Sequence, residues 1–386
     1  MKRNKKKRPA NTPVIIAFIT LCITAVGLFY FLGKPSVRIS KPVFEEDYVS
    51  SNKFRKINGK VDHLIYESLY DEGVKEEDIS FTNVIHRHKN DLDWDFTELT
   101  VRLDNPDSIN RLVNNISKKI SVLHPDVSLK TEKISSIEFV LNIKIFDSFS
   151  HRLILRHEAK KKAEIAKLPR VAFIIDDIGY DEFLATSFMK LEIPVCLSVL
   201  PDAPYSKEIA AKTVENGREL LLHLPMEPKD YPEINPGKRA LMIDMDRSAI
   251  QTIVRDDIMK FPGLKGVNHH MGSLFSENYL KMKYVLDEIK KHNLYYVDSR
   301  TTNRTVAYKV AKALGVPSAE KSLFIDNDLS EKALKYQMDR LLGIARYKGS
   351  AIGIGHPHPE TLHILEEYTG QLKKSYTVVP VSELVH

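Results

Sequence analysis

The sequence predicts an α/β protein whose C-terminal domain is a parallel sheet covered by helices. Three observations lead to this prediction. From about residue 170 to the end, buried strands alternate with helices, as in parallel α/β folds. Before them, residues 55–156 follow the order helix, strands, helix, strands, which is typical of a small α+β domain. Near the N-terminus, a 19-residue uncharged apolar run predicts a transmembrane helix.

Length, charge and cysteine content narrow the class of protein. A chain of 386 residues suits two domains and an additional segment. The formal net charge of the whole chain is +6. Six positive charges stand in the first eight residues alone, at Lys2, Arg3, Lys5, Lys6, Lys7 and Arg8. The remainder is about neutral, so we expect no nucleic-acid partner. Two cysteines, Cys22 and Cys196, cannot make a cysteine zinc site.

The N-terminal segment has the pattern of a signal anchor. Residues 14–32 read VIIAFITLCITAVGLFYFL, and as a helix they cover roughly 28 Å, close to the hydrocarbon thickness of a bilayer. The basic residues 1–13 precede this run and stay on the cytoplasmic side. We expect a single pass through the cytoplasmic (inner) membrane, with the C-terminal domains extracytoplasmic or periplasmic. A cleaved signal peptide is the alternative, disfavoured by the bulky residues at the end of the run.

Residues 33–54 are polar and irregular and suggest a stalk, and the small α+β domain follows at 55–156. Apolar residues every four positions predict a helix from Lys56 to Tyr70, and Asp107 is the expected N-cap of a second helix. The expected strands span 93–103, 127–130, 137–146 and 151–158. The histidines of this domain are scattered and predict no site. Residues 157–169, rich in Ala, Lys and Glu, suggest a linker helix.

The C-terminal domain, residues 170–386, contains apolar segments without alternation, which indicates strands buried on both faces. The expected strands span 171–175, 194–200, 219–224, 264–268, 294–297, 317–319, 350–355 and 376–381. Helices fill the gaps, for example at 206–216, 277–292 and 331–347. Seven or eight such units make either a parallel barrel or a doubly wound sheet, and periodicity leaves both open.

Polar residues follow five of the expected strands, where both architectures place their functional sites. They are Asp176 and Asp177, His223 and Glu227, His269 and His270, Asp298 and Arg300, and His356 and His358. Each has an ordinary structural explanation when taken alone, such as helix capping or a core histidine. Their common position at strand ends instead predicts a polar active site.

One carboxylate and two neutral imidazoles make an open site for a divalent metal, which activates water and polarises a carbonyl. A second carboxylate beside the first can act as a general base. Adjacent residues of a regular strand point to opposite faces, so Asp176 and Asp177 can share a site only if the strand turns at once, with the help of Gly179. Of the consecutive His269 and His270, one must face the site.

Five motifs, in order, resemble the divergent polysaccharide deacetylase family, a remote branch of the polysaccharide deacetylases and carbohydrate esterases. They are FIIDDIG, LLLHLPMEP, GVNHHMGS, YYVDSRTT and GIGHPHPET, and the resemblance covers about residues 170–386. Taken together the motifs are specific, although each alone is weak. The resemblance implies a distorted (β/α) barrel.

The resemblance also implies roles for single residues. Asp176 corresponds to the base, Asp177 to a metal ligand, and His356 to the general acid. In the typical deacetylases a second metal histidine stands four residues after the first, whereas here Glu227 follows His223. We therefore expect His270 to complete a site formed with Asp177 and His223. The remaining expectations are catalytic support from Asp298 and Arg300, and substrate contacts from Glu227, His269 and His358.

These roles imply a Zn²⁺-dependent hydrolase acting on carbon–nitrogen or ester bonds. The expected reaction is deacetylation of an envelope polysaccharide or peptidoglycan-type glycan. The altered histidine motif keeps an alternative open: a non-catalytic envelope protein that binds a glycan or a protein on a deacetylase-like scaffold. A metal phosphoesterase has less support, because the sequence has no Gly-rich phosphate loop.

Overall fold

The computed structural model describes residues 53–75, 78–89, 92–158 and 168–386. The expected basic segment 1–13, the anchor 14–32, nearly all of the stalk and most of the linker helix lie outside the described residues. Among the residues that the structure describes, no helix is both long enough and apolar enough to cross a membrane.

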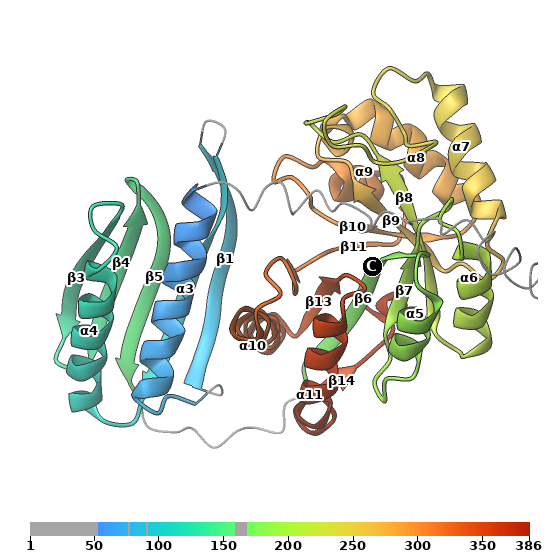
Figure 1. Ribbon diagram of the computed structural model, residues 1–386. Coiled ribbons are helices and arrows are strands. Elements are labelled where there is room, and N and C mark those ends of the chain that lie inside the picture. Colours follow the sequence, from blue (N-terminus) through green and yellow to red (C-terminus); the bar gives the residue numbers. More distant parts are fainter. Residues whose placement is uncertain (1–52, 76–77, 90–91, 159–167) are drawn as a thin grey trace, which may run out of the picture. The chain divides into compact units, whose positions relative to one another are not determined.

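The small domain is a five-stranded sheet with two helices side by side over one face (Figure 1). The strand order is β1-β2-β5-β4-β3, with β2 and β5 parallel and the other pairs antiparallel. Its elements are α3 (Lys53–Asp71), β1 (Ile79–Lys89), β2 (Leu92–Leu103), α4 (Pro106–Ser121), β3 (Val127–Ser135), β4 (Glu138–Ile145) and β5 (Ser148–His157).

Two details of this domain differ from the sequence analysis. Strand β1 was not predicted, although it pairs with β2 along most of its length. The N-cap of α4 is Asn105 rather than Asp107, because the Asn105 side chain accepts the backbone N–H of Asp107 at 2.9 Å. Asp107 instead stands in the first turn, where a negative charge suits the helix dipole.

The large domain is built on one parallel sheet with the order β11-β10-β9-β8-β7-β6-β13-β12, and β14 also pairs with β6. Its strands are β6 (Arg170–Ile178), β7 (Cys196–Val199), β8 (Glu219–Met226), β9 (Gly266–Met271), β10 (Tyr295–Asp298), β11 (Ser318–Glu320), β12 (Leu323–Phe324), β13 (Ser350–Gly355) and β14 (Thr377–Val378). The short β12 was not predicted, and β14 covers only part of the predicted 376–381.

The chain connection between β11 and β12 requires the sheet to curl. These strands form opposite edges of the main strand path, yet β11 ends at Glu320 and β12 begins at Leu323. Three residue steps span at most about 11 Å, whereas eight strands laid flat would separate their outer strands by about 34 Å. The sheet is therefore a curled half-barrel, consistent with a deacetylase-type (β/α) barrel. This resolves the choice that periodicity left open.

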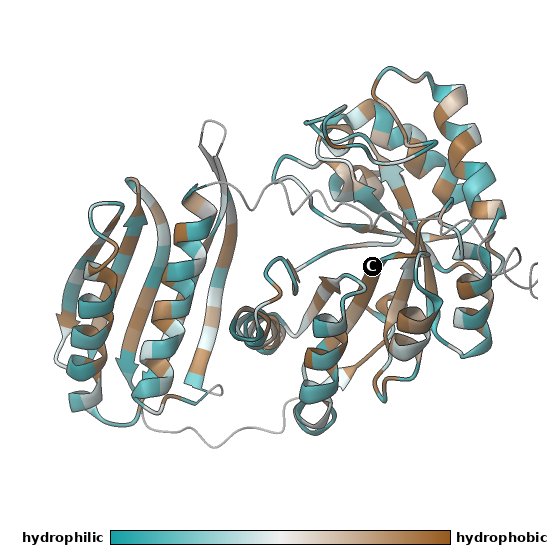
Figure 2. Ribbon diagram, in the orientation of Figure 1, coloured by the Kyte–Doolittle hydropathy of each residue, from teal (hydrophilic) through white to brown (hydrophobic). Residues whose placement is uncertain are grey.

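Helices cover the outside of the curled sheet (Figure 1). They are α5 (Glu182–Met189), α6 (Ser206–Glu215), α7 (Arg247–Met259), α8 (Tyr279–Lys291), α9 (Ala307–Leu314), α10 (Glu331–Lys348) and α11 (Pro359–Ser375), with 3-10 turns η2 (Phe275–Glu277) and η3 (Val381–Glu383). Apolar residues dominate the strands, whereas polar residues lie on the outer helices (Figure 2). Consecutive strand residues such as Ile174 and Ile175 point to opposite faces and belong to separate apolar clusters. Both sheet faces are thus buried, as predicted.

Candidate metal centre

The end of β6 presents two consecutive carboxylates to the same site. The pairing of β6 with β7 shifts register between Ile175 and Ile178, and Asp177 has a φ of +53°. This irregularity breaks the alternation that would send Asp176 and Asp177 to opposite faces. Gly179 follows with a φ of +142°, and a Cβ there would lie 2.5 Å from the Cβ of Ala203. The turn expected after the aspartate pair is therefore present, and only glycine fits it.

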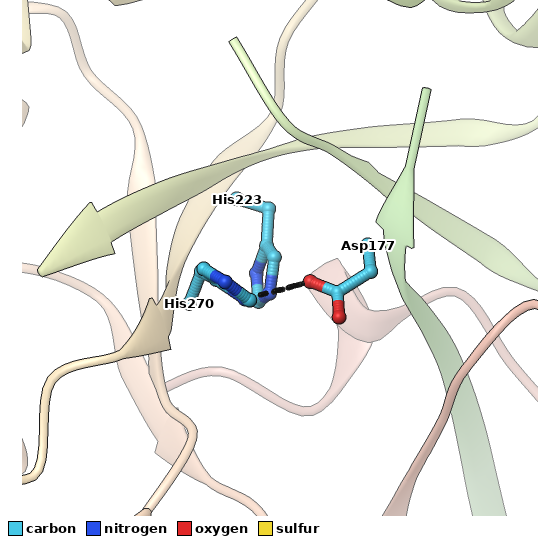
Figure 3. A group of neighbouring side chains, drawn as sticks. All are labelled: Asp177, His223 and His270. Atoms are coloured by element: carbon cyan, nitrogen blue, oxygen red, sulfur yellow. Dashed lines mark ion pairs between the residues drawn. The ribbon is translucent and has the colours of Figure 1, made fainter. Parts of the chain in front are cut away.

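Asp177, His223 and His270 form a buried cluster whose candidate ligand atoms all lie within 4.8 Å of one another. The Asp177 Oδ1 atom is 2.9 Å from His223 Nε2 and 2.8 Å from His270 Nδ1. The three side chains converge from β6, β8 and β9 (Figure 3). They are the three residues that the sequence analysis expected to hold the metal.

The chemistry of this cluster fits a divalent cation. Both Asp177 carboxylate oxygens are buried, and neither accepts a hydrogen bond within the described residues despite the short contacts to the imidazoles. Burial opposes the charge of Asp177, but His270 and His223 outweigh burial and hold its pKa well below the usual value. A buried, ionised carboxylate requires a positive charge beside it. One carboxylate and two imidazoles also match catalytic zinc sites, which keep a position open.

Asp176 is buried beside the cluster and has a different set of partners. The Asn268 side-chain amide donates to both of its carboxylate oxygens, at 2.7 and 3.0 Å. Burial raises the pKa of Asp176, and the neighbouring His223, His356 and Asn268 only partly offset that effect. A carboxylate with a raised pKa is a better proton acceptor, which suits the role of a base.

Asn268 also contacts one of the metal-site histidines. Its Oδ1 accepts hydrogen bonds from Ser198 Oγ at 2.6 Å and from His223 Nδ1 at 2.8 Å. Asn268 was not predicted as a site residue, although its place two residues before His270 on β9 gave a signal. Side chains at i and i+2 of a strand share one face, so a ligand at His270 predicts Asn268 at the same site.

His356 is held by Asp326, a second residue that the sequence analysis missed. Asp326 accepts the His356 backbone N–H at 2.5 Å and the ring Nδ1–H at 2.9 Å. Thr361 Oγ1 donates to the same carboxylate at 2.6 Å. Burial opposes the charge of Asp326, but the charge and hydrogen bonds of His356 outweigh it and lower its pKa. Asp326 follows the unpredicted β12, so no expected strand end indicated it.

Asp298 and Arg300 lie near the site but have structural partners. The Asp298 carboxylate accepts the backbone N–H groups of Arg300 at 2.9 Å and Tyr308 at 3.1 Å, and the Thr305 hydroxyl at 2.9 Å. These bonds fix the turn that leads into α9. The Arg300 guanidinium pairs with Glu320. The structure therefore does not bring these two side chains into the cluster.

Of the three residues expected to contact substrate, Glu227 and His358 have structural roles, whereas His269 lines the pocket at the site. Glu227 Oε2 accepts the backbone N–H of Ile243 at 2.5 Å and so fixes the long β8–α7 loop. His269 lines the pocket beside the metal cluster, and its Nδ1 pairs with the Tyr296 hydroxyl at 2.7 Å. Burial, followed by the nearby His223 and Lys321 charges, lowers the pKa of His269 to about 3. His358 is the N-cap residue of α11.

A small pocket brings several of these residues together. Asp176, His223, His269, His270 and His356 line it with Phe324. The Phe324 ring stacks on the His356 imidazole, with their centroids 5.7 Å apart. A base, a metal cluster and an imidazole that can act as an acid therefore open onto one space.

Comparisons with known proteins agree with this architecture. A family model described as divergent polysaccharide deacetylase matches residues 173–385. The chain is 33% identical over 217 residues to the uncharacterized protein YibQ of Escherichia coli K12, covering 56% of this chain and 67% of that protein. It is 30% identical over 220 residues to an uncharacterized Haemophilus influenzae protein, covering 56% of this chain and 76% of that protein.

The fold also occurs among solved structures. The uncharacterized protein ATU2773 of Agrobacterium tumefaciens superposes with a TM-score of 0.54 at 23% sequence identity. The match covers 58% of this chain and 92% of ATU2773. All three of these relatives are uncharacterized, so their names assign no reaction to this chain.

Proposed function

The chain belongs to the divergent polysaccharide deacetylase family, and we propose that it is a Zn²⁺-dependent hydrolase that removes acetyl groups from an envelope polysaccharide. The observation that carries this proposal is the Asp177–His223–His270 cluster, which stands beside Asp176 and His356. A metal position, a base and an acid on one pocket are the groups that hydrolysis of an amide or ester needs.

The proposed mechanism assigns one task to each group. Asp177 Oδ1, His223 Nε2 and His270 Nδ1 would hold the ion. A divalent ion supplies Lewis acidity, which makes water nucleophilic near neutral pH and polarises an acyl carbonyl. Asp176 takes the proton of the attacking water, and its raised pKa favours that transfer.

His356 completes the reaction by protonating the leaving amine or alcohol. Because its Nδ1–H is committed to Asp326 at 2.9 Å, we assign the delivered proton to Nε2. Asp326 keeps the ring in this orientation and stabilises its charged form. In a typical two-histidine deacetylase motif the second histidine comes from the same loop as the first; here His270 on β9 takes that place.

The substrate assignment rests on the family, which is described as divergent polysaccharide deacetylase. Nucleic acid is not proposed, because the chain outside its first eight residues is about neutral.

Metal content tests the proposal directly. We expect the purified full-length chain to hold about one Zn²⁺, and Asp177→Ala and His270→Ala to lose most of it, because each removes one of three ligands. Elemental analysis measures the ion. Asp246→Ala is the matched control, since Asp246 caps α7 through the Ala249 N–H and should keep its zinc. A wild-type chain without zinc, or unchanged zinc in both ligand variants, would reject the proposal.

Asp176→Asn separates catalysis from binding. This variant keeps all three metal ligands, so we expect it to retain zinc but to release acetate from N-acetylglucosamine oligomers at least about 100-fold more slowly. Acetate release by the wild type is the reference. A protein that binds zinc but shows no difference between wild type and Asp176→Asn, in acetate release and in cells, would favour the non-catalytic glycan- or protein-binding alternative.

A further inference from the structure

We infer that Asn268 is a positioning residue that fixes His223 for metal binding and Asp176 for catalysis through a single side-chain amide. The inference rests on the proposed function, because it assumes that His223 is a metal ligand. It assigns a role to a residue for which neither the motif pattern nor the comparisons give one. Asn268 is fully buried and touches both groups directly.

The partners of Asn268 decide which way its amide points. In the ionised form that a base requires, the carboxylate of Asp176 can only accept hydrogen bonds, so the NH₂ group of Asn268 must face it, at 2.7 and 3.0 Å. The amide oxygen then faces Ser198 Oγ and His223 Nδ1 on the other side. The reverse orientation would place the Asn268 amide oxygen against the Asp176 carboxylate. Both oxygen–oxygen contacts would then be repulsive.

This orientation in turn sets the tautomer of His223. An amide oxygen only accepts, so the 2.8 Å contact requires a proton on His223 Nδ1. In the neutral ring the lone pair is then on Nε2, which lies 2.9 Å from Asp177 Oδ1 within the metal cluster. Partners of this kind orient a ligating histidine and raise its basicity, and their loss weakens metal binding 10- to 100-fold.

The hydrogen bonds of Asn268 also couple four neighbouring strands. Ser198 lies on β7, His223 on β8 and Asn268 on β9, while Asp176 is at the end of β6. The amide oxygen accepts two hydrogen bonds and the amide nitrogen donates to Asp176, so its bonding capacity is used. Because the group is saturated and buried, the base and the ligand keep a fixed relation to each other.

Two substitutions separate the two contacts of Asn268. Asn268→Ala removes both, and we expect Zn²⁺ affinity to fall 10- to 100-fold. Asn268→Asp keeps an acceptor for His223 but sets a second carboxylate against Asp176. We expect it to bind Zn²⁺ within about threefold of wild type and to release acetate from N-acetylglucosamine oligomers at least about 100-fold more slowly.

Zn²⁺ affinity is measured by competition with a chelator, and the absorption bands of bound Co²⁺ report ligand geometry. Circular dichroism verifies folding. Asn278→Ala is the matched control, because Asn278 caps α8 through the Lys281 N–H and its loss should not change Zn²⁺ affinity. Wild-type affinity and an unchanged Co²⁺ spectrum in folded Asn268→Ala would overturn the inference alone, as would full acetate release by Asn268→Asp. A wild type that binds no Zn²⁺ would overturn the proposed function as well.

Discussion

Asp176 and Asp326 are both buried carboxylates, yet their surroundings move their pKa values in opposite directions. Burial dominates at Asp176 and raises its pKa, whereas the contacts with His356 prevail over burial at Asp326 and lower its pKa. Environments that separate the pKa values of two acids also separate their roles. Asp176 suits proton transfer, and Asp326 suits a permanent negative charge that supports His356.

Asp326→Asn tests this division at the residue scale. The substitution keeps the shape of the side chain but removes its charge, so we expect acetate release to fall about 10- to 100-fold with Zn²⁺ content unchanged. We also expect a loss of about 2 kcal/mol in the free energy of unfolding at pH 7, because charge-assisted hydrogen bonds to His356 and Thr361 are lost. Acetate assays and urea unfolding measure the two effects.

The pH dependence of unfolding has a defined sign. The pKa of Asp326 is lower in the folded chain than its ordinary value, so its contribution to stability is present above that ordinary value of about 4. The contribution is lost as the pH falls through the folded pKa. The stability difference between wild type and Asp326→Asn should therefore shrink below about pH 4. A difference that is constant from pH 7 to pH 3 would contradict this assignment.

Single residues were predictable where they followed a recognisable strand. Asp177 and His223 follow long apolar segments, and His270 follows the expected strand at 264–268, so their convergence could be expected. Asn268 and Asp326 could not be found in this way. Asn268 is a neutral residue whose importance depends on its neighbours across three strands, and Asp326 follows a two-residue strand without a sequence pattern.

At the scale of elements, the turn after β6 positions the aspartate pair, and Gly179 permits it. Gly179→Ala would require a φ of +142° and would place a Cβ 2.7 Å from Ser206 Oγ, besides the contact with Ala203. We expect the free energy of unfolding to fall by about 3 kcal/mol, because strain and overlap add. Zn²⁺ affinity should fall too, since Asp177 is two residues away. Chemical unfolding and chelator competition measure these changes.

Gly217→Ala is the matched control for this turn. Gly217 also has a positive φ, +65°, but a Cβ there would meet nothing within 4 Å. We expect a cost of about 1 kcal/mol, from backbone strain alone, and unchanged Zn²⁺ affinity. Equal effects of the two substitutions on stability and on Zn²⁺ would show that the turn after β6 has no special role.

Elements were predicted well where periodicity was strong. The apolar segments of β6, β8 and β13 indicated buried strands, and α10 begins at the predicted residue Glu331. Strand β1 was missed because His86, Arg87 and His88 interrupt its apolar pattern, so the pairing with β2 determines its conformation. Asp107 was expected to cap α4, because carboxylates are favoured at the N-cap. Asn105 is the N-cap instead, because it directly precedes the proline at the first helical position.

At the scale of the large domain, the curl of the sheet assembles the site. Asp176, His223 and His270 come from β6, β8 and β9, whereas Asp326 and His356 follow β12 and β13 on the other side of β6. Strand order cannot be read from apolar periodicity, which is why the sequence alone could not distinguish a barrel from a doubly wound sheet. The two-residue connection between β11 and β12 supplies that information once the pairing is known.

The N-terminal segment bears on where this chemistry would take place. Residues 14–32 carry no charge and follow a basic cluster, so we propose a single membrane pass with the deacetylase-like domain outside the cytoplasm. An envelope glycan is accessible only from that side. We expect the full-length chain to remain in the membrane fraction after washing with high salt, and deletion of residues 14–32 to release it.

Orientation is tested with a reporter at the C-terminus. Alkaline phosphatase folds only outside the cytoplasm, where disulfides form, so its fusion to this chain should be active. Replacing the six Lys and Arg residues of the first eight positions by Gln should reduce that activity, because in the proposed orientation these charges would hold the N-terminus inside. Insertion into hydrocarbon depends on apolar surface, whereas orientation depends on charge. The deletion should therefore remove the chain from the membrane fraction. The charge variant should stay in the membrane fraction but lower the reporter activity. An inactive fusion to the unaltered chain would place the domain in the cytoplasm and separate the metal site from any envelope glycan.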